Sequence, residues 1–244
     1  MRTSSPRIDI QKIDGKVIAH NYGHGGSGWT LAPGITEYVN TRLLESRLSK
    51  DLNYNTPITI VGAGAIGLFT AYDLINRGYI NITIISDRFE NLTSHNAGGL
   101  LAPISMNNDE EVETLINKVG IDSYKFYESI ALNFHTDFPD GAKIMPAYFT
   151  DRESSGLEPY VGIVMEEAKD VILDFGNGTH RRMVAYDDGI FIDTSILMKR
   201  LKEFLENKIE FEKRHISCFS EIKTKYIINC TGIGSKDLNK DLFG

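Results

Sequence analysis

Residues 57–78 read PITIVGAGAIGLFTAYDLINRG, and this stretch decides the fold. The β-branched residues at 58–61 predict a short buried strand, and the pattern G-x-G-x-x-G follows it directly at 62–67. Apolar residues at helical spacing then predict a helix that ends at Gly78, and residues 82–85 predict a second strand. This order of strand, glycines, helix and strand indicates a β-α-β unit of a parallel sheet.

The glycines and an acidic residue indicate a dinucleotide site. Gly62, Gly64 and Gly67 share three tasks, which are a tight turn, access of a pyrophosphate to backbone N–H groups, and close contact between helix and strand. The helix N-terminus adds roughly half a positive charge toward that pyrophosphate. Asp87 follows the last glycine by about 20 positions, the place of a ribose ligand in such units. We favour dinucleotide binding over a glycine-rich turn in an ordinary α/β sheet.

Composition excludes several classes of protein. The chain has 244 residues with 26 basic and 33 acidic side chains, so its net charge of −7 argues against a nucleic-acid or anionic-membrane surface. No apolar run approaches the roughly 20 residues that span a bilayer, and no signal peptide is recognisable. Two cysteines are too few for a disulfide framework or a zinc cluster, so we expect a reducing cytoplasm and no metal.

A second glycine-rich stretch precedes this unit. Residues 20–30 read HNYGHGGSGWT, with four glycines in the six positions from 23 to 28. Packing does not explain these glycines, because glycine loses the most backbone entropy on folding and contributes no side chain. An amphipathic helix is expected from about Thr36, so the loop would offer N–H donors to an anion or a carbonyl oxygen. For His24 we favour a loop histidine bonded to backbone over a catalytic base.

Four motifs together resemble one family, and the G-x-G-x-x-G unit at 62–67 is one of them. HNYGHGGSGWT resembles the flavin-contacting motif of the D-amino-acid oxidase and D-aspartate oxidase family of FAD enzymes. Residues 86–103, SDRFENLTSHNAGGLLAP, and 229–234, NCTGIG, resemble further cofactor-contacting elements of that family. In the family the glycine-rich loop lies near the C-terminus, whereas here it comes first. The resemblance therefore implies a circularly permuted arrangement that lacks part of the substrate domain.

The resemblance implies FAD as the cofactor. Cofactor contacts are expected at Gly62, Gly64, Ala65, Ile66, Gly67, Asp87, Arg88, Thr93, Ser94, Gly99, Leu100, Thr231, Gly232, Gly25, Gly26, Ser27, Gly28, Trp29 and Thr30. Asp87 and Arg88 would lie at the adenosine, and residues 27–30 would donate to the pyrimidine carbonyl of the flavin. Thr93 and Ser94 would bond phosphate oxygens, with a helix cap or a turn as the alternative.

Further roles concern the flavin ring and the substrate. Gly99 and Leu100 would let the isoalloxazine ring lie flat, and Gly26 would offer a backbone contact near the substrate amine. Arg2 is a candidate for the arginine that binds the substrate carboxylate, with a disordered terminal residue as the alternative. The tyrosine that shares this task in the family has no identifiable counterpart. Cys230 is interpreted as a small buried residue rather than a reactive thiol.

The predicted fold class is α/β, with an FAD-binding Rossmann-type parallel sheet and an inserted, mostly antiparallel substrate-domain sheet. Residues 1–52 would form the glycine-rich flavin-contacting loop and a helix packed on the FAD domain. Residues 53–106 and 194–244 would form the FAD-binding domain, and 107–193 a partial substrate or cap domain. Further helices are expected at 122–138 and from residue 193 or 194, and strands at 143–150, 160–166, 171–175, 182–186, 209–213 and 225–230.

Three functions remain open from the residues and the resemblance. The first is an FAD-dependent oxidoreductase that deaminates an amino acid by hydride transfer to flavin N5 and is reoxidised by O2. The second is a flavin-binding protein or fragment without oxidase activity, because its carboxylate-binding residues are missing. The third is an NAD-dependent dehydrogenase, which Asp87 would permit. A nicotinamide site requires neither the glycine-rich loop at 20–30 nor the stretch 229–234, so these two motifs argue against it. The expected partners are a small-molecule amino acid and O2, with a further chain or a homo-oligomer completing the substrate sheet.

Overall fold

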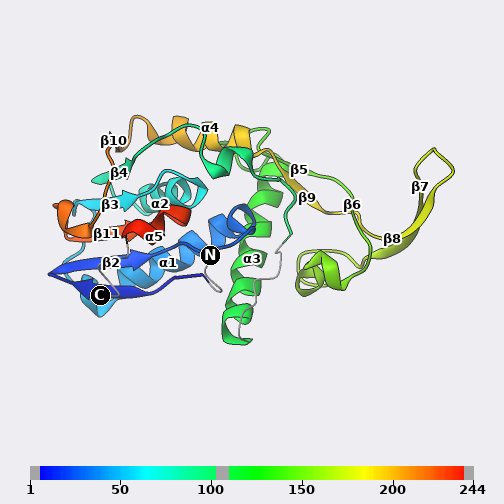
Figure 1. Ribbon diagram of the computed structural model, residues 1–244, viewed down its shortest axis with the longest axis horizontal. Coiled ribbons are helices and arrows are strands. Elements are labelled where there is room, and N and C mark those ends of the chain that lie inside the picture. Colours follow the sequence, from blue (N-terminus) through cyan, green and yellow to red (C-terminus); the bar gives the residue numbers. More distant parts are fainter. Residues whose placement is uncertain (1–5, 103–109, 239–244) are drawn as a thin grey trace.

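A six-stranded sheet forms the body of the molecule in the computed structural model, which describes residues 6–102 and 110–238. Its strands are β1 (Ile10–Ile13), β2 (Lys16–His20), β11 (Tyr226–Asn229), β3 (Ile58–Val61), β4 (Ile82–Ser86) and β10 (Glu210–Lys213), in that spatial order. Every neighbouring pair is parallel except β1 and β2. Figure 1 shows this sheet on the left.

Helices surround the sheet. The α-helices are α1 (Gly28–Glu45), α2 (Ala65–Asn76), α3 (Glu110–Ala131), α4 (Thr194–Leu205) and α5 (Ser235–Leu238). Short 3₁₀ helices are η1 (Arg47–Ser49), η2 (Thr93–Asn96), η3 (Glu153–Ser155), η4 (Glu158–Tyr160), η5 (Phe219–Glu221) and η6 (Gly232–Gly234). Helix α1 packs against both α2 and α3, and α2 packs against α4. Within the described residues no helix combines the length and the apolar character that a membrane crossing requires.

Two small antiparallel sheets lie beyond α3. Strand β5 (Ala142–Ile144) pairs with β9 (Ile190–Ile192), and β8 (His180–Tyr186) lies between β6 (Ala147–Phe149) and β7 (Lys169–Asp174). The β7–β8 hairpin projects away from the body at the right of Figure 1. The fold class is therefore the predicted one, with a mostly parallel main sheet and small antiparallel sheets.

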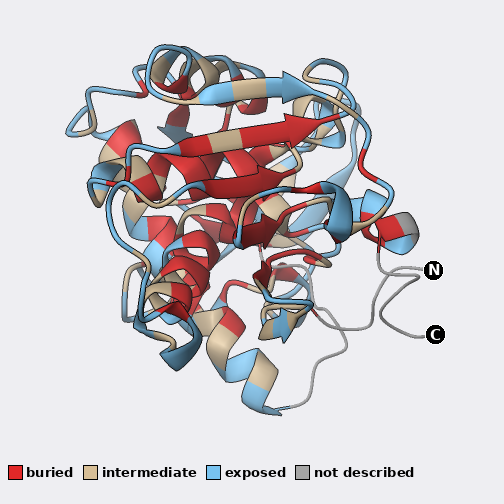
Figure 2. Ribbon diagram, turned by 90° about the vertical axis from the view of Figure 1, so that its left-hand side faces the viewer, coloured by how far each residue is buried: buried red, intermediate tan, exposed pale blue. Residues whose placement is uncertain are grey.

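The main sheet separates two apolar layers, because successive side chains of a strand point to opposite faces. On one face Ile58 and Ile60 belong to the large core that also contains buried residues of α1 and α2. On the other face Val61 and Ile227 pack in a smaller cluster with residues 216–222 and α5. Figure 2 shows the buried residues gathered in the central strands and in the helices beside them. The sheet is therefore covered on both faces, as parallel sheets require.

The central β-α-β unit has the predicted form. Strand β3, helix α2 and strand β4 follow one another at the expected positions, and β3 pairs with β4 in parallel. The predicted helix start at residue 193 or 194 is also confirmed, because the Asp193 carboxylate caps α4 by accepting from Ile196 N–H. The predicted strands at 171–175 and 182–186 are confirmed as the β7–β8 hairpin.

Helix α1 begins earlier than predicted. It starts at Gly28 rather than near Thr36, and it contains Pro33. A proline within a helix has no N–H to donate, so the carbonyl of Trp29, four residues earlier, loses its usual partner. The Tyr127 hydroxyl of α3 donates to that carbonyl at 2.7 Å instead. Helix α3 thus stabilises a helical turn that the local sequence disfavours.

Three further predicted elements need correction. The helix predicted at 122–138 spans Glu110–Ala131, and it stops before Asn133, whose φ is +61°. The strand predicted at 143–150 is divided at Pro146 into β5 and β6, which pair with different partners. The strand predicted at 160–166 is absent, because the N–H groups of residues 163–165 all bond the Tyr160 carbonyl in a tight turn.

The hairpin of β1 and β2 was not predicted. Its turn is Asp14–Gly15, and both residues have positive φ, +47° and +79°. Asp-Gly is a preferred pair for a two-residue hairpin turn, so the signal was present in the sequence. This hairpin matters for function because it brings β2 beside β11 in the main sheet. The glycine-rich loop after β2 therefore starts from the same sheet edge as the turn after β3.

Candidate functional site

The candidate site lies at the carboxyl ends of four parallel strands. Strands β2, β11, β3 and β4 are adjacent, and the chain leaves their ends as residues 21–27, 230–232, 62–64 and 87–88 respectively. In open α/β sheets ligands bind outside these ends. The order of the strands therefore brings together all four segments that the sequence analysis connected with a cofactor.

The first glycine turn requires the absence of side chains. Gly62 has φ +108°, and a Cβ there would lie 2.5 Å from the Cys230 carbonyl oxygen. A Cβ on Gly67 would lie 1.9 Å from the Gly62 carbonyl oxygen. Gly64 caps the N-terminus of α2, and its nearest neighbour is the Ser94 hydroxyl at 3.1 Å from an added Cβ. Gly62 and Gly67 therefore serve packing, whereas Gly64 keeps the helix N-terminus accessible.

Ser94 connects the two glycine-rich segments. Its hydroxyl accepts a hydrogen bond from Ala65 N–H, in the first turn of α2, at 2.9 Å. Its carbonyl accepts a hydrogen bond from the indole Nε1–H of Trp29, in the first turn of α1, also at 2.9 Å. One residue thus contacts both helix N-termini. The stretches 24–30 and 62–67, distant in the sequence, are thus both in contact with Ser94.

The first turn of α1 is fixed by its side chains. The Trp29 indole packs edge-on against Phe69 of α2 with ring centroids 6.1 Å apart, and the Thr30 hydroxyl donates to the Ala102 carbonyl at 3.3 Å. The side chain of Ser27 makes no capping hydrogen bond. The N–H groups of residues 28–30 have no carbonyl partner within the helix. Ser94 thus meets a backbone donor of α2 and the indole of α1, and both helices begin with N–H groups that have no carbonyl partner within the helix.

The glycine-rich loop has the conformation that its composition predicted. Gly23 and Gly25 have φ of +87° and +58°, where side chains are rarely accommodated, and Gly25 and Gly26 are exposed. Ser27 N–H donates to the His24 carbonyl and closes the turn. His24 is buried, burial lowers its pKa to about 4, and its Nε2 has no partner among the described residues. The predicted hydrogen bond of His24 to backbone is thus not made by Nε2.

The segment after β4 contains the residues expected at the adenosine and the phosphates. Asp87 and Arg88 are exposed, and the Ser86 hydroxyl donates to the Arg88 carbonyl at 2.7 Å. Thr93 is exposed at the start of η2. Ser94 is therefore the residue of this segment that directly meets α2, whereas Asp87, Arg88 and Thr93 present their side chains to solvent.

Gly99 and Leu100 lie on the small sheet. Gly99 accepts a hydrogen bond from Ile192 N–H at 2.7 Å, and a Cβ on Gly99 would lie 2.0 Å from the Ile192 carbonyl oxygen. Leu100 forms a β-bridge with Phe191 and is 40% exposed. The contact with β9 explains the glycine at 99 by itself. The proposed contact of these residues with a flavin ring remains a prediction.

The turn after β11 lies directly against the turn after β3. Thr231 Cα is 3.2 Å from the Cβ that Gly62 lacks, and Gly232 has φ +56°. The Asn229 side-chain oxygen accepts hydrogen bonds from both the N–H and the hydroxyl of Thr231. Cys230 is buried, and burial raises its pKa to about 12, which agrees with a packing role rather than a reactive thiol.

The structure brings together most of the predicted residues but not the substrate arginine. Arg2 lies outside the described residues. Arg7 donates to the Asp9 carboxylate through Nε and Nη2, and to the Tyr22 hydroxyl through Nη1. All three nitrogens of Arg7 therefore have partners within the chain. Within the described residues no group of three or more His, Cys, Asp or Glu side chains is arranged to hold a metal ion.

Sequence reasoning missed three polar residues at the same edge of the sheet. His20 and Asn229 are fully buried at the ends of β2 and β11, where they are register partners. Asn21 is also buried, and neither polar atom of its side chain has a partner among the described residues. All three belong to the two motifs quoted above. A rule that assigns polar residues at the ends of predicted parallel strands to the site would have found Asn229, but not His20 and Asn21, because strand β2 was not predicted.

Comparisons with known proteins agree with this arrangement. The family described as "DAO: FAD dependent oxidoreductase" matches residues 57–244. The D-amino-acid oxidase of Dictyostelium discoideum is 27% identical over 191 residues, which are 75% of this chain and 53% of that protein. The glycine-rich loop at 20–30 lies outside the family match, so its place beside the matched region is a finding of the structure.

Solved structures share the fold at low sequence identity. The L-amino acid deaminase from Proteus vulgaris with its specific insertion sequence deleted matches with a TM-score of 0.54 at 17% identity, over 78% of this chain and 57% of that chain. The L-proline dehydrogenase from P. horikoshii matches with a TM-score of 0.55 at 16% identity, over 77% of this chain and 56% of that chain. The present chain thus spans little more than half the length of these proteins. Since the family match covers most of its residues, the chain belongs to the family of FAD-dependent oxidoreductases that includes the D-amino-acid oxidases.

Proposed function

We propose that this chain binds FAD across the carboxyl ends of β2, β11, β3 and β4. The observation that carries the proposal is the double contact of Ser94, which joins the N-terminus of α2 to the N-terminus of α1. Members of the family bind FAD, an extended molecule with a pyrophosphate at its centre and a flavin at one end. Two helix N-termini that both contact one residue fit such a molecule, because each offers N–H donors and a partial positive charge.

The residues present fit the cofactor in several places. Residues 62–67 would hold the pyrophosphate, because no side chain covers the backbone at Gly64 and α2 begins directly after it. Ser94 accepts from Ala65 N–H, a donor that a phosphate oxygen would also satisfy. Asp87 and Arg88 would bind the adenosine, and Thr93 a phosphate oxygen. Thr231, Gly232, Gly99 and Leu100 would border the flavin.

The proposed reaction is the oxidation of an amino acid at its amine-bearing carbon. FAD, when bound, supplies the electron-pair acceptor for this chemistry. The chain would orient the substrate through the exposed backbone of Gly26 and through Arg2 as the partner of the carboxylate. The N-terminus of α1 would stabilise negative charge on the flavin, because the N–H groups of residues 28–30 lie at its positive end. The nature of the amino acid side chain is not part of this proposal.

A second candidate is a flavin-binding protein that does not oxidise amino acids. Arg7 favours it, because this arginine follows Arg2 closely in the sequence and yet donates all three nitrogens to Asp9 and Tyr22. A guanidinium bound in this way is poorly placed to bind a substrate carboxylate as well. The two candidates share the cofactor and differ in the substrate.

Replacing Gly64 by valine tests the cofactor. At Gly64 φ is −72° and ψ −178°, which valine adopts readily, and the nearest neighbour is a hydroxyl that can rotate. We therefore expect Gly64→Val to fold but to lose FAD, measured by visible absorbance of the purified protein and by quenching of flavin fluorescence. Ser195→Val is the matched control, because Ser195 is exposed in the first turn of α4. Equal retention of FAD by both variants would place the pyrophosphate elsewhere.

Anaerobic reduction separates the two candidates. If the chain oxidises amino acids, D-amino acids should bleach the flavin absorbance in the absence of oxygen, and admitting air should restore the colour. If flavin is bound but remains oxidised across a panel of D-amino acids, glycine and L-proline, the second candidate is correct. Chemical reduction by dithionite serves as the control, because it shows that the bound flavin is able to accept electrons.

A further inference from the structure

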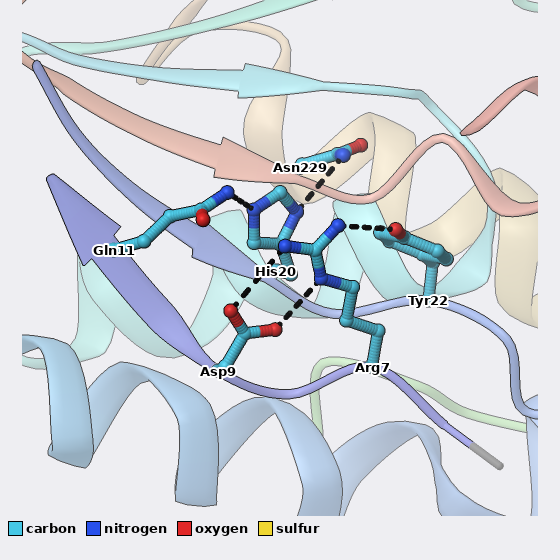
Figure 3. Close-up of polar contacts among 6 residues, drawn as sticks. All are labelled: Arg7, Asp9, Gln11, His20, Tyr22 and Asn229. Atoms are coloured by element: carbon cyan, nitrogen blue, oxygen red, sulfur yellow. Dashed lines mark hydrogen bonds and ion pairs between the residues drawn. The ribbon is translucent and has the colours of Figure 1, made fainter. Parts of the chain in front are cut away.

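A polar cluster lies next to the proposed cofactor turn, between β1, β2 and β11. Figure 3 shows its members pointing toward one another, with the ring of His20 between the amides of Gln11 and Asn229. Arg7, Asp9 and Tyr22 form a second group beside the ring. His20 and Asn229 are both fully buried. Polar side chains at such a depth are normally held by specific hydrogen bonds, so their orientation is determined.

Thr231 fixes the orientation of the Asn229 amide. The Asn229 oxygen accepts from Thr231 N–H at 3.3 Å and from the Thr231 hydroxyl at 2.7 Å. A backbone N–H is always a donor, so the atom facing it must be the amide oxygen. The amide nitrogen of Asn229 therefore faces His20, with Nδ2 and Nδ1 3.2 Å apart. Asn229 has no freedom to turn without breaking both bonds to Thr231.

The Asn229 amide in turn fixes the proton of His20. Since Asn229 donates to Nδ1, that ring nitrogen must carry a lone pair, and a neutral imidazole then carries its proton on Nε2. Nε2 of His20 lies 2.6 Å from Nε2 of Gln11, and because a protonated ring nitrogen needs an acceptor, the Gln11 amide must be turned so that its oxygen faces the ring. A charged ring would place an Nδ1–H against the NH₂ group of Asn229.

The electrostatic surroundings agree with a neutral ring. Burial, and after it the nearby Arg7 guanidinium, lower the pKa of His20 to about 4 against the opposing effect of the Asp9 carboxylate. Two aromatic rings lie edge-on to the His20 ring. The ring centroid of Tyr22 is 5.7 Å from that of His20, and the centroid of Phe219, in η5, is 6.2 Å away. Arg7 is ion-paired with Asp9, so the two charges beside the ring oppose each other and burial is the main cause of the neutral ring. His20 is thus neutral at the pH at which proteins normally work.

We propose that His20 is a positioning residue, which as the Nε2–H tautomer holds Asn229 so that the Thr231–Gly232 turn is set for FAD. Three successive side-chain contacts connect Gln11 with His20, His20 with Asn229, and Asn229 with Thr231. Thr231 lies against the Gly62 turn, where an added Cβ would be 3.2 Å from its Cα. This inference rests on the proposed FAD binding. It assigns to the β1–β2 hairpin the task of ordering the turn after β11.

Two substitutions of His20 separate positioning from packing. His20→Asn places an amide oxygen near the position of Nδ1, so it can still accept from Asn229. His20→Gln carries its amide one bond further, near the position of Nε2, so it loses that contact although it fills more of the space. If His20 only filled space, the smaller asparagine would be the more damaging change.

The dissociation constant of FAD, measured by fluorescence quenching with the apoproteins, gives the first readout. We expect His20→Asn to stay close to the wild type and His20→Gln to bind roughly three- to tenfold more weakly, the factor that one lost hydrogen bond represents. Weaker binding by His20→Asn than by His20→Gln would overturn the positioning role. A wild-type protein that does not bind FAD would refute the proposed function instead.

Nitrogen NMR of the wild-type apoprotein gives a readout that needs neither FAD nor a folded variant. The long-range ¹H–¹⁵N spectrum should show His20 with an unprotonated Nδ1 and a protonated Nε2 at neutral pH. A proton on Nδ1 would contradict the orientation of Asn229 and so overturn the proposal, whether or not FAD binds. Thr231→Val, which keeps the backbone donor to Asn229 and loses the hydroxyl donor, should leave the tautomer unchanged.

Discussion

At the scale of single residues, two histidines show how burial couples the protein to pH. Burial lowers the pKa of both His20 and His24 to about 4, whereas an unfolded chain has histidines near 6.5. Between these values the unfolded state binds more protons than the folded state, so the free energy of unfolding falls as pH falls. The stabilisation is fully present above about pH 6.5 and lost below about pH 4, on the order of 3 kcal/mol for each histidine.

Urea unfolding of the apoprotein at a series of pH values tests this coupling. We expect the midpoint to decrease steadily from pH 7 to pH 4.5. In His24→Gln, which removes one of the groups with a lowered pKa, the decrease should be less steep. The same slope in both proteins would mean that His24 does not resist protonation in the folded state. The measurement is made without FAD, since a bound ligand adds its own stabilisation.

The residue scale also shows where sequence reasoning reached its limit. The pattern G-x-G-x-x-G correctly placed three glycines at the junction of β3 and α2, because each lies where a side chain has no room or would cover the helix N-terminus. Gly99 was expected to make room for a flavin ring, yet the Ile192 carbonyl explains it without one. A glycine in a sequence indicates that another group lies close to its backbone, but it does not identify that group. That group often comes from a distant segment, here β9.

At the scale of elements, α3 explains the conformation of α1. Pro33 leaves the Trp29 carbonyl without a helical partner, and Tyr127 donates to it at 2.7 Å. The next N–H, that of Gly34, donates to the Ser123 hydroxyl of α3 at 2.9 Å. A Cβ on Gly34 would lie 2.1 Å from the Val119 carbonyl, so the two helices cross closely. The first turn of α1, with its donors toward the proposed flavin, is therefore held in place by α3.

A double-mutant cycle tests this interaction between α1 and α3. Tyr127→Phe should destabilise the protein by about 1–3 kcal/mol, because it leaves a buried carbonyl without a donor. Pro33→Ala supplies the missing N–H within α1, so Tyr127→Phe should cost clearly less in that background. Both are measured by urea unfolding. As a control, Tyr124→Phe removes a bond from α3 to the Asp188 carbonyl, and its cost should not depend on residue 33. Additive effects of Tyr127→Phe and Pro33→Ala would contradict the assignment.

Elements could be predicted where their causes are local in the sequence, and they could not where the cause lies in a distant element such as α3. The β3–α2–β4 unit could be predicted because its signals are local, from the apolar strand to the glycines and the helix end. The start of α1 could not, because the donor that compensates for Pro33 comes from a residue almost one hundred positions away. The β1–β2 hairpin had a local Asp14–Gly15 signal and was predictable. Local patterns are therefore sufficient for elements with local causes, although the signal of the β1–β2 hairpin was not used in the prediction.

At the scale of the whole molecule, the N-terminal segment is part of the main sheet. Strand β2 lies between β1 and β11, and α1 packs on α2 and α3. The segment that connects α1 to β3 is attached as well, since Asp51 accepts from Lys225 at 2.6 Å and from Tyr226 at 2.5 Å. This integration explains how a glycine-rich loop that precedes the nucleotide-binding unit in sequence still reaches it. The predicted domain limits at residues 52 and 193 remain predictions.

Cleaving the segment that connects α1 to β3 tests whether the non-covalent contacts are sufficient to hold the N-terminal segment in place. We expect a protease site inserted between Tyr54 and Asn55, in the exposed turn 53–56, to be tolerated. After cleavage the two fragments should stay together in size-exclusion chromatography and should still bind FAD, because a strand pairing and two helix contacts cross the cut. The same site in the β7–β8 turn at Asn177 is the control for cleavage itself. Release of the N-terminal fragment would show that the covalent connection holds α1 in place. In that case the loop 20–30 would meet the turn 62–67 through chain connectivity, and the order of the two motifs along the chain would be essential for the site.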